Sequence, residues 1–368
     1  MTPRPARENA GAHMKKIAVI PGDGIGIDVT REAMKVLRAL VATRGLPLEF
    51  VDMPWGADHF LRTGESFPRA SLEEIRDRFD AVFLGALGDP RIPDMSHARD
   101  ILFGLRFGLD LYVNFRPVQC FEDRLCPLKG REAKDVNFVV FRENTEGLYV
   151  GMGGNFKKGT PDEVAINEDL NTRKGVERIL RAAFEWARRN GKKRLVMSDK
   201  SNALRFAHDL WQRAFAEVAR DYSDVEASHL YVDALTMQMV KNPAQFDVIV
   251  TCNMFGDIVT DLGSQLQGGL GMAASANLNP GHVSMFEPVH GSAPKYSGKD
   301  VANPLAAIMT VQLLLDHVGY SAEGRLVERA VRTALRDGKT TRDVGGTLGT
   351  AATGDFIAGE VGRLAKEK

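Results

Sequence analysis

The sequence lacks a surplus of charge of either sign. Its 48 Lys and Arg residues balance 48 Asp and Glu residues, so the formal net charge is +0. A neutral chain has no long-range attraction to nucleic acid or to an anionic membrane surface, and we expect neither as a partner. An anionic ligand must therefore be held by a local group of basic side chains.

Cysteine is scarce, and long apolar runs are absent. Cys120, Cys126 and Cys252 are the only cysteines, and they form no CxxC pair, which excludes a disulfide framework and a zinc–cysteine site. Free thiols fit a reducing compartment, so we expect a cytoplasmic protein. No apolar stretch is long enough to span a bilayer. Residues 1–13 lack the apolar core of a secretory signal, and we expect a disordered extension there.

What is present is an alternation of short apolar runs and helical patterns. The run Ile17 to Ile20 and its following turn precede apolar residues at helical spacing: Val29, Ala33, Val36, Leu37 and Leu40. Further buried strands are expected at 81–84, 136–141, 195–197 and 246–251, and a buried helix at 303–317. The pattern predicts an α/β fold whose sheet is mainly parallel and covered by helices. With 368 residues, the chain is long enough for two lobes.

Two segments depart from that alternation. Gly22-Asp23-Gly24-Ile25-Gly26 lies between a strand and a helix, but Ile27 stands where the dinucleotide fingerprint needs its last glycine. We therefore expect a tight turn with close backbone packing and not a Rossmann site. Between Val150 and Asn171 the glycines, polar residues and short alternating pieces predict a hairpin or protruding arm.

Three arginines lie among apolar residues near the ends of expected core elements. Arg106 lies in an expected helix over 103–111, Arg116 in the run Asn-Phe-Arg-Pro, and Arg142 at the end of a strand. Such arginines are either ion-pair partners or a cradle for a carboxylate, which a guanidinium binds through two parallel hydrogen bonds. Their spacing does not decide between the two.

Acidic, basic and phenolic groups with possible catalytic use follow other expected strands. Asp257 and Asp261 lie four residues apart on an expected helix, where like charges repel unless a cation lies between them. The apolar residues around them favour a magnesium-type site over two solvated acids. Lys200 and Tyr149 are either structural, or a base and an acid with suitable pKa values.

A loop of small residues is the best candidate for nucleotide binding. It contains His290, Gly291, Ser292, Ala293 and Pro294 and is followed by Lys295 and Tyr296. Such a loop lets a ligand approach the main chain closely, although an ordinary turn would have the same residue pattern. The lysine is placed where a cation for a phosphate would be useful.

Together, these segments resemble the β-decarboxylating dehydrogenases, which include isopropylmalate, isocitrate, homoisocitrate, tartrate and D-malate dehydrogenases. The motifs are IPGDGIG at 20–26, NFRP at 114–117, FRENTEGLYVG at 141–151, SDKSN at 198–202, FGDIVTD at 255–261 and EPVHGSAP at 287–294. The likeness runs from about Lys16 to about Ile357. It implies a two-lobed fold that is not Rossmann, with a central mixed sheet, flanking helices and a dimerisation arm. Residues 14–111 and 268–368 would form the large cofactor-binding lobe, and residues 112–267 a small lobe with the dimer interface and the arm.

The resemblance also implies roles for individual residues. Arg106, Arg116 and Arg142 would hold the malate-like part of a small 2-hydroxy acid, with Asn202 as a nearby polar contact. Asp233, Asp257 and Asp261 would hold Mg²⁺ or Mn²⁺. Lys200 would be the base and Tyr149 the acid. The active site would be shared in a homodimer, since Lys200 and Asp233 would come from the partner subunit. The loop from His290 to Pro294, with Asn303, would bind the adenosine.

The resemblance by itself does not identify the cofactor or the substrate, which depend on individual residues. Lys295, Tyr296 and Arg342 resemble the residues that NADP-using isocitrate dehydrogenases place at the 2′-phosphate, so we favour NADP over NAD; a solvated surface lysine is the alternative. Leu102 and Phe103 make an apolar wall before Arg106, which favours 3-isopropylmalate or a similar alkylmalate. Tartrate or D-malate ranks second, because the segment at 144–147 and the one at 84–88 resemble those enzymes, and isocitrate ranks third.

Two other classes of protein give different expectations. A non-catalytic dimeric scaffold would have lost its catalytic side chains, yet Lys200, Tyr149 and the three aspartates are present. A Rossmann 2-hydroxy acid dehydrogenase would need no metal and would release no carbon dioxide. A chelator distinguishes it from the metal-dependent enzyme.

Overall fold

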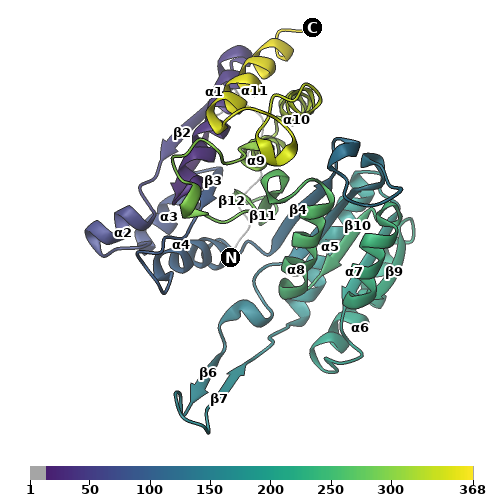
Figure 1. The fold of residues 1–368 in the computed structure, drawn as a ribbon. Helices are drawn as coiled ribbons and strands as arrows, with labels where there is room; N and C mark the ends of the chain where they lie inside the picture. The colour runs from purple at the N-terminus through teal and green to yellow at the C-terminus, as the bar shows by residue number, and fades with distance from the viewer. Residues whose placement is uncertain (1–13, 368) are drawn as a thin grey trace. The chain divides into compact units, whose positions relative to one another are not determined.

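The computed structural model describes residues 14–367, so the expectation for residues 1–13 lies outside the described chain. The chain divides into two compact units (Figure 1). Unit 1 contains residues 14–111 and 268–367, and unit 2 contains residues 112–267. Within the described residues, no helix has the length and apolar character needed to cross a membrane.

Unit 1 is built on a mixed sheet with the strand order β2-β1-β3-β12-β11. Its strands are β1 (Lys15–Gly22), β2 (Leu48–Asp52), β3 (Ala81–Ala86), β11 (Ala274–Leu278) and β12 (Ser284–Pro288). All neighbouring strands in this order run parallel except the antiparallel pair β11 and β12. Its helices are α1 (Ile25–Arg44), α2 (Ala57–Thr63), α3 (Arg69–Arg78), α4 (Ser96–Gly108), α9 (Leu305–His317), α10 (Ser321–Arg336) and α11 (Thr350–Leu364). Short 3-10 turns lie at Leu270–Met272, Pro294–Tyr296 and Arg342–Val344.

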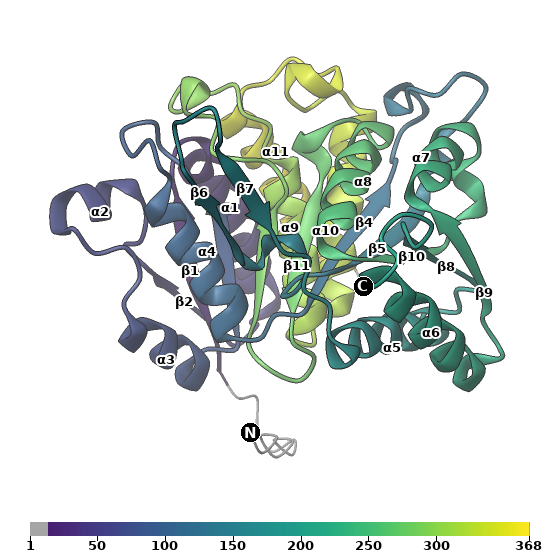
Figure 2. The ribbon, with the colours of Figure 1, turned by 90° about the horizontal axis from the view of Figure 1, so that it is seen from below.

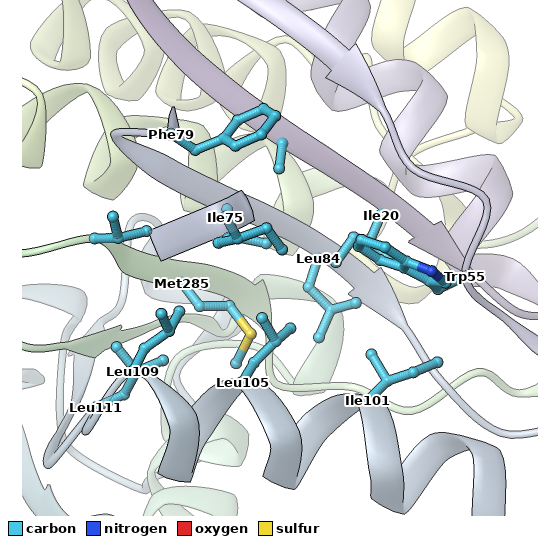
Figure 3. Packing of buried hydrophobic residues seen from close by; sticks show 13 residues of the cluster. Ile20, Trp55, Ile75, Phe79, Leu84, Ile101, Leu105, Leu109, Leu111 and Met285 are labelled. Carbon is cyan, nitrogen blue, oxygen red and sulfur yellow. The ribbon is translucent and has the colours of Figure 1, made fainter. Parts of the chain in front are cut away.

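The two faces of this sheet are covered by different helices. Helices α1 and α9 pack on one face, and α10 and α11 pack against them. On the other face, Ile101 and Leu105 of α4 point toward Leu84 of β3 and Met285 of β12 (Figure 3). These apolar side chains are fully buried, and burying one of them stabilises the fold by about 1.5–3 kcal/mol. The packing fixes the face of α4 that is turned inward and hence the place of Arg106.

Unit 2 contains strands that are also mixed in direction and follow the order β4-β5-β10-β8-β9. Its strands are β4 (Val113–Gln119), β5 (Asn137–Glu143), β8 (Arg194–Asp199), β9 (Glu226–Tyr231) and β10 (Val248–Thr251). The pair β4 and β5 is antiparallel and the others are parallel. Its helices are α5 (Arg173–Arg189), α6 (Ala207–Ala219), α7 (Val232–Lys241) and α8 (Asn253–Leu266), and 3-10 turns lie at Asp123–Leu125, Ala133–Asp135, Leu148–Val150, Arg220–Tyr222 and Pro243–Gln245. Helices α5 and α6 cover one face, and α7 and α8 the other (Figure 2).

A two-stranded hairpin extends away from the sheet of unit 2 (Figure 1). It consists of β6 (Gly153–Phe156) and β7 (Val164–Asn167), which pair antiparallel with each other and with no other described strand. The side chains of both strands are exposed, including Phe156, Val164 and Ile166. The hairpin expected between Val150 and Asn171 is therefore confirmed.

The expected α/β fold with a mixed sheet and flanking helices is also confirmed, and so is the tight glycine turn. Gly22 has φ +74°, and a Cβ atom there would lie 2.0 Å from the carbonyl oxygen of Ala86. Gly24 has φ +57°, and a Cβ atom there would lie 2.2 Å from the carbonyl oxygen of Ser292. Only glycine tolerates such backbone angles and approaches together.

Two expectations about the arginine-bearing elements were wrong. The helix around Arg106 was expected over 103–111, but α4 begins at Ser96 and ends at Gly108. It ends there because Asp110 has φ +50° and redirects the chain. Arg116 does not lie at the end of an element either, since it pairs with Val140 in the middle of β4.

Candidate active site

Asp257 is the centre of a polar cluster in unit 2. Its Oδ1 accepts a hydrogen bond of 2.5 Å from Arg142 Nη1 and lies 3.6 Å from Arg116 Nη2. Its Oδ2 accepts a bond of 3.3 Å from the hydroxyl of Tyr149. Helix α8 thus brings one carboxylate to two guanidinium groups and a phenol.

Both arginines have further partners that fix their direction. Arg142 donates from Nε and Nη2 to Oδ1 of Asn253, at 3.0 and 2.8 Å, and Arg116 donates from Nη1 to the hydroxyl of Thr260 at 2.6 Å. Both side chains are buried. A buried guanidinium is costly unless it is paired and hydrogen-bonded, and these contacts supply that compensation.

Gly256 makes room for this arrangement. A Cβ atom at this position would lie 2.4 Å from Cγ and 2.5 Å from Cβ of Arg142. The side chain of Arg142 therefore crosses helix α8 where the helix has no side chain of its own. The glycine of the FGD motif has a packing role that sequence reasoning did not identify.

Tyr149 has the environment of a group that keeps its proton. Burial is the main cause that raises the pKa of Tyr149, and the negative charge of Asp257 raises it further. Arg142, whose guanidinium carbon lies 5.7 Å from the ring centroid, acts in the opposite direction. A protonated phenol next to a carboxylate is a donor and can act as an acid.

Asp261 lies one helical turn beyond Asp257. Burial, followed by the charge of Asp257, raises the pKa of Asp261. A carboxylate whose ionisation is disfavoured by a neighbouring carboxylate is suited to a divalent cation, which would reverse that effect. Within residues 14–367, no group of three Asp, Glu, His or Cys side chains comes together as a metal site, so the structure does not bring Asp233 to this pair.

Lys200 and Asp233 form a second cluster in unit 2. Lys200 Nζ donates a hydrogen bond of 2.8 Å to Asp233 Oδ1, and this bond is the main cause that lowers the pKa of Asp233. Lys200 directly follows β8, and Asp233 is in the first turn of α7. Asn202 is exposed on the same loop as Lys200.

Arg106 belongs to unit 1, whereas Arg116 and Arg142 belong to unit 2. Its Nη2 donates to Glu287 Oε1 at 3.1 Å, and Asn277 donates to the same oxygen at 2.8 Å. Leu102, one turn earlier on α4, packs against the apolar core of the unit, and Phe103 contacts Phe107 with ring centroids 5.6 Å apart. All three predicted arginines therefore have acidic partners in the described chain, and Glu287 was not identified from the sequence.

The loop from His290 to Pro294 joins the glycine turn of the first strand. Ile25 N–H donates to the carbonyl oxygen of Ser292 at 2.7 Å, and Ala293 has φ +34°. His290 has one ring nitrogen, Nδ1, 3.1 Å from the Gly291 oxygen, whereas Nε2 is buried and has no hydrogen-bond partner in the described chain. Burial lowers the pKa of His290. A neutral ring with one buried, unsatisfied nitrogen is a ready partner for a polar ligand.

The other expected nucleotide residues lie in the same unit. Asn303 donates to Asp343 Oδ2 at 2.8 Å and accepts from Leu305 N–H at 2.9 Å, so its side chain already has protein partners. Asp343 follows Arg342, which is exposed. Lys295 Nζ lies 4.7 Å from the ring centroid of Tyr296, and the ring is itself exposed.

The chain is similar to known proteins over most of its length. The family model described as isocitrate/isopropylmalate dehydrogenase matches residues 16–359. The chain is 46% identical over 352 residues to a 3-isopropylmalate dehydrogenase of Thermobifida fusca, with 95% of this chain and 98% of that protein covered. It is 47% identical over 339 residues to one of Streptomyces griseus, with 90% and 96% covered.

Two solved structures are similar as well. The isocitrate dehydrogenase of Methylococcus capsulatus superposes with a TM-score of 0.86 at 38% identity, covering 95% of this chain and 99% of that one. The TT0538 protein of Thermus thermophilus superposes with a TM-score of 0.84 at 39% identity, covering 96% and 69%.

Proposed function

Because this chain belongs to the isocitrate/isopropylmalate dehydrogenase family, we propose that it catalyses the metal-dependent oxidative decarboxylation of 3-isopropylmalate or a similar alkylmalate. The observation that carries the proposal is the cluster at Asp257, where Arg116, Arg142 and Tyr149 meet one carboxylate. The relatives named 3-isopropylmalate dehydrogenase support the choice of substrate.

The donor set in unit 2 fits a hard divalent cation. Carboxylate oxygens are the ligands that Mg²⁺ and Mn²⁺ prefer, and Asp257 raises the pKa of Asp261 as a neighbouring negative charge. Asp257 and Asp261 would hold the ion, with Asp233 of a second copy. The bound ion would polarise the hydroxyl and adjacent carboxylate of the substrate and stabilise negative charge on oxygen.

The reaction follows from the groups of this chain. Lys200 of a second copy would take the proton of the substrate hydroxyl, and a bound nicotinamide would supply the acceptor for the hydride of the same carbon. The 2-keto acid then loses its β-carboxylate as CO₂, and the electron pair of the broken C–C bond forms an enolate. Tyr149 gives its proton to the enolate carbon. Arg106, Arg116 and Arg142 hold the substrate carboxylates and fix their orientation.

We also propose NADP as the preferred cofactor. Lys295 and Tyr296 directly follow the loop that carries the unsatisfied His290 Nε2, and Arg342 is adjacent to Asp343, the partner of Asn303. A lysine and an arginine beside an adenosine-binding loop offer cations for a 2′-phosphate. NAD has no such group and would leave them without a ligand.

The apolar face of α4 supports an alkyl group on the substrate. Leu102 packs on the core of unit 1 one turn before Arg106, and Phe103 precedes Arg106 by three residues on the same helix. Asp100 is directed to Ser66, from which it accepts a hydrogen bond of 2.8 Å. A carboxylate placed against Leu102 and Phe103 would be costly, whereas an isopropyl group would be favourable.

We propose a homodimer that uses the exposed apolar surface of unit 2. Phe156, Val164 and Ile166 are exposed on the hairpin, and Met237 and Ile258 are exposed on α7 and α8. An isolated two-stranded hairpin is marginally stable in water, so a partner surface must cover it. Each copy would give Lys200 and Asp233 to the other's site. We place the dimer in the cytoplasm, in keeping with its three free cysteines.

Initial rates of cofactor reduction test the proposal. The purified protein is assayed with Mg²⁺ or Mn²⁺ on 3-isopropylmalate, D-malate, tartrate, isocitrate and homoisocitrate, each with NADP and with NAD. A clear preference for 3-isopropylmalate is expected. A preference for isocitrate, tartrate or D-malate would contradict the proposal that α4 contacts an alkyl group of the substrate. If none of the hydroxy acids were oxidised, a non-catalytic scaffold would be favoured.

A further inference from the structure

The backbone of Lys200 is bound by a histidine side chain. The N–H of Lys200 donates a hydrogen bond of 2.8 Å to Nδ1 of His208. His208 is the second residue of α6 and is almost fully buried. The bond is made at the backbone of Lys200, so it leaves the amine free to reach Asp233.

This bond fixes the protonation state of the ring. Because Nδ1 accepts, it carries no proton, and the proton of the neutral ring must be on Nε2. That nitrogen lies 3.8 Å from Asp169 Oδ2, and the ring packs edge-on against Phe255 with centroids 5.5 Å apart. Burial lowers the pKa of His208 and outweighs the opposite influence of Asp199 and Asp169, the two acids that face it.

The residue before Lys200 is held just as firmly. Asp199 is fully buried, and its Oδ1 accepts from Ser201 N–H at 3.1 Å and from His229 Nε2 at 2.8 Å. Its Oδ2 accepts from Gln212 at 2.8 Å. The chain is therefore held at two neighbouring residues: Asp199 through its side chain, and Lys200 through its backbone bond to His208.

We infer that His208 is a positioning residue that sets the backbone of Lys200 and thereby directs its amine. The inference rests on the proposed role of Lys200 as the base. A buried histidine could instead only fill space between α6 and α8. The two roles differ in one respect: positioning needs an acceptor at Nδ1, whereas filling needs only the volume of the ring.

Two substitutions separate these roles. His208→Asn places an amide oxygen close to the position of Nδ1 and keeps the acceptor, whereas His208→Phe keeps the ring volume and removes the acceptor. His208→Phe is expected to lower kcat by about 10- to 100-fold, the effect of a displacement near 1 Å, with the KM for the cofactor within about twofold of wild type. His208→Asn is expected to restore most of kcat despite its smaller volume.

A matched control is His317→Phe, which replaces a histidine of unit 1 that packs against Phe286 and is expected to leave kcat unchanged. Equal kcat in His208→Phe and wild type, or a loss in His208→Asn as large as in His208→Phe, would overturn the inference and leave a space-filling role.

Hydrogen exchange of the Lys200 amide gives a readout that does not depend on activity. It is expected to accelerate in His208→Phe and to remain near the wild-type rate in His208→Asn. If wild type oxidised no hydroxy acid while the exchange rates behaved as expected, the proposed function would fail and the hydrogen bond would stand. Unchanged exchange in His208→Phe would instead refute the positioning itself.

Discussion

The hydroxyl of Tyr149 donates a hydrogen bond to Oδ2 of Asp257, and Arg142 donates one of 2.5 Å to Oδ1 of the same carboxylate. The proposed acid, a proposed substrate arginine and a proposed metal ligand are therefore one connected group. A change at Tyr149, whose side chain is partly exposed, should alter the chemistry more than the fold, whereas Arg142 is buried and a change there should affect both.

Tyr149→Phe removes the acid and keeps the ring that lies near Arg142. We expect kcat to fall by about 10²- to 10⁴-fold, the usual contribution of a positioned acid, with little change in thermal stability. Steady-state kinetics and a melting curve measure both. A kcat within threefold of wild type would show that another group protonates the product.

Gly256→Ala tests the space that Arg142 occupies. A methyl group there would lie 2.4 Å from Arg142 Cγ, so the side chain must move. We expect the KM for the hydroxy acid to rise about tenfold and the free energy of unfolding to fall by about 1–3 kcal/mol.

The matched control is Gly359→Ala, on helix α11, where nothing lies within 4 Å of an added Cβ atom. That change should raise stability by about 0.5–1 kcal/mol through helix propensity and leave KM as it is. Similar effects from both substitutions would mean that Gly256 is a helix residue with no special role.

Asp261→Asn separates repulsion from metal binding. Burial and Asp257 raise the pKa of Asp261, so its charge opposes folding at neutral pH when no cation is bound. In EDTA, the variant should be at least as stable as wild type. With Mn²⁺, wild type should gain stability and the variant should not, since a specific ligand stabilises only the state that binds it. Glu185→Gln, on α5, is the control. An equal gain from Mn²⁺ in Asp261→Asn and wild type would exclude Asp261 as a ligand.

Lys295→Asp tests cofactor choice. The variant loses an attraction to the 2′-phosphate and gains a repulsion, and each of these changes costs about 1 kcal/mol for charges near 4 Å apart in water. The ratio of kcat/KM for NADP over NAD should therefore fall roughly 30-fold. Lys299→Asp, nearby in the same loop, is the control for a change of net charge. The same small shift in both variants would make Lys295 an ordinary surface lysine.

Stability should fall in mild acid because of one buried and two half-buried histidines. Burial lowers the pKa of His208, His290 and His317, so the folded state binds fewer protons than the unfolded state below about pH 6.5, the ordinary histidine value. The contribution of these histidines to the free energy of unfolding is therefore fully present above that pH and is lost as the pH falls toward their folded-state pKa values. His317→Phe should reduce the slope of the free energy of unfolding against pH by at most about 1.4 kcal/mol per pH unit. Urea unfolding from pH 5.5 to 7.5 measures it, and parallel curves for variant and wild type would contradict this account.

Much of the fold could be predicted, because apolar periodicity reports burial directly. The apolar stripe of α1 and the hairpin were found in this way, since each depends on local sequence. The end of α4 was misplaced, because the left-handed Asp110 that redirects the chain gives no local signal.

The contacts within the site were harder to predict from the sequence than the fold, because they join residues far apart in the chain. Residues with unusual chemistry, such as Lys200 and Asp257, could be singled out from their motifs. The residues that hold Arg106, Arg142 and Lys200 lie at least eight positions away along the chain; they are Glu287, Asn253 and His208. Contacts between separate elements have no periodicity that a single sequence would show.

The most direct test of the central claim is the stoichiometry of CO₂ release. The purified protein is incubated with 3-isopropylmalate, NADP and Mn²⁺, and CO₂ and NADPH are measured together, with and without EDTA. We predict one CO₂ for each NADPH and the loss of both with EDTA. NADPH formed without CO₂, or formed at an unchanged rate in EDTA, would contradict the account.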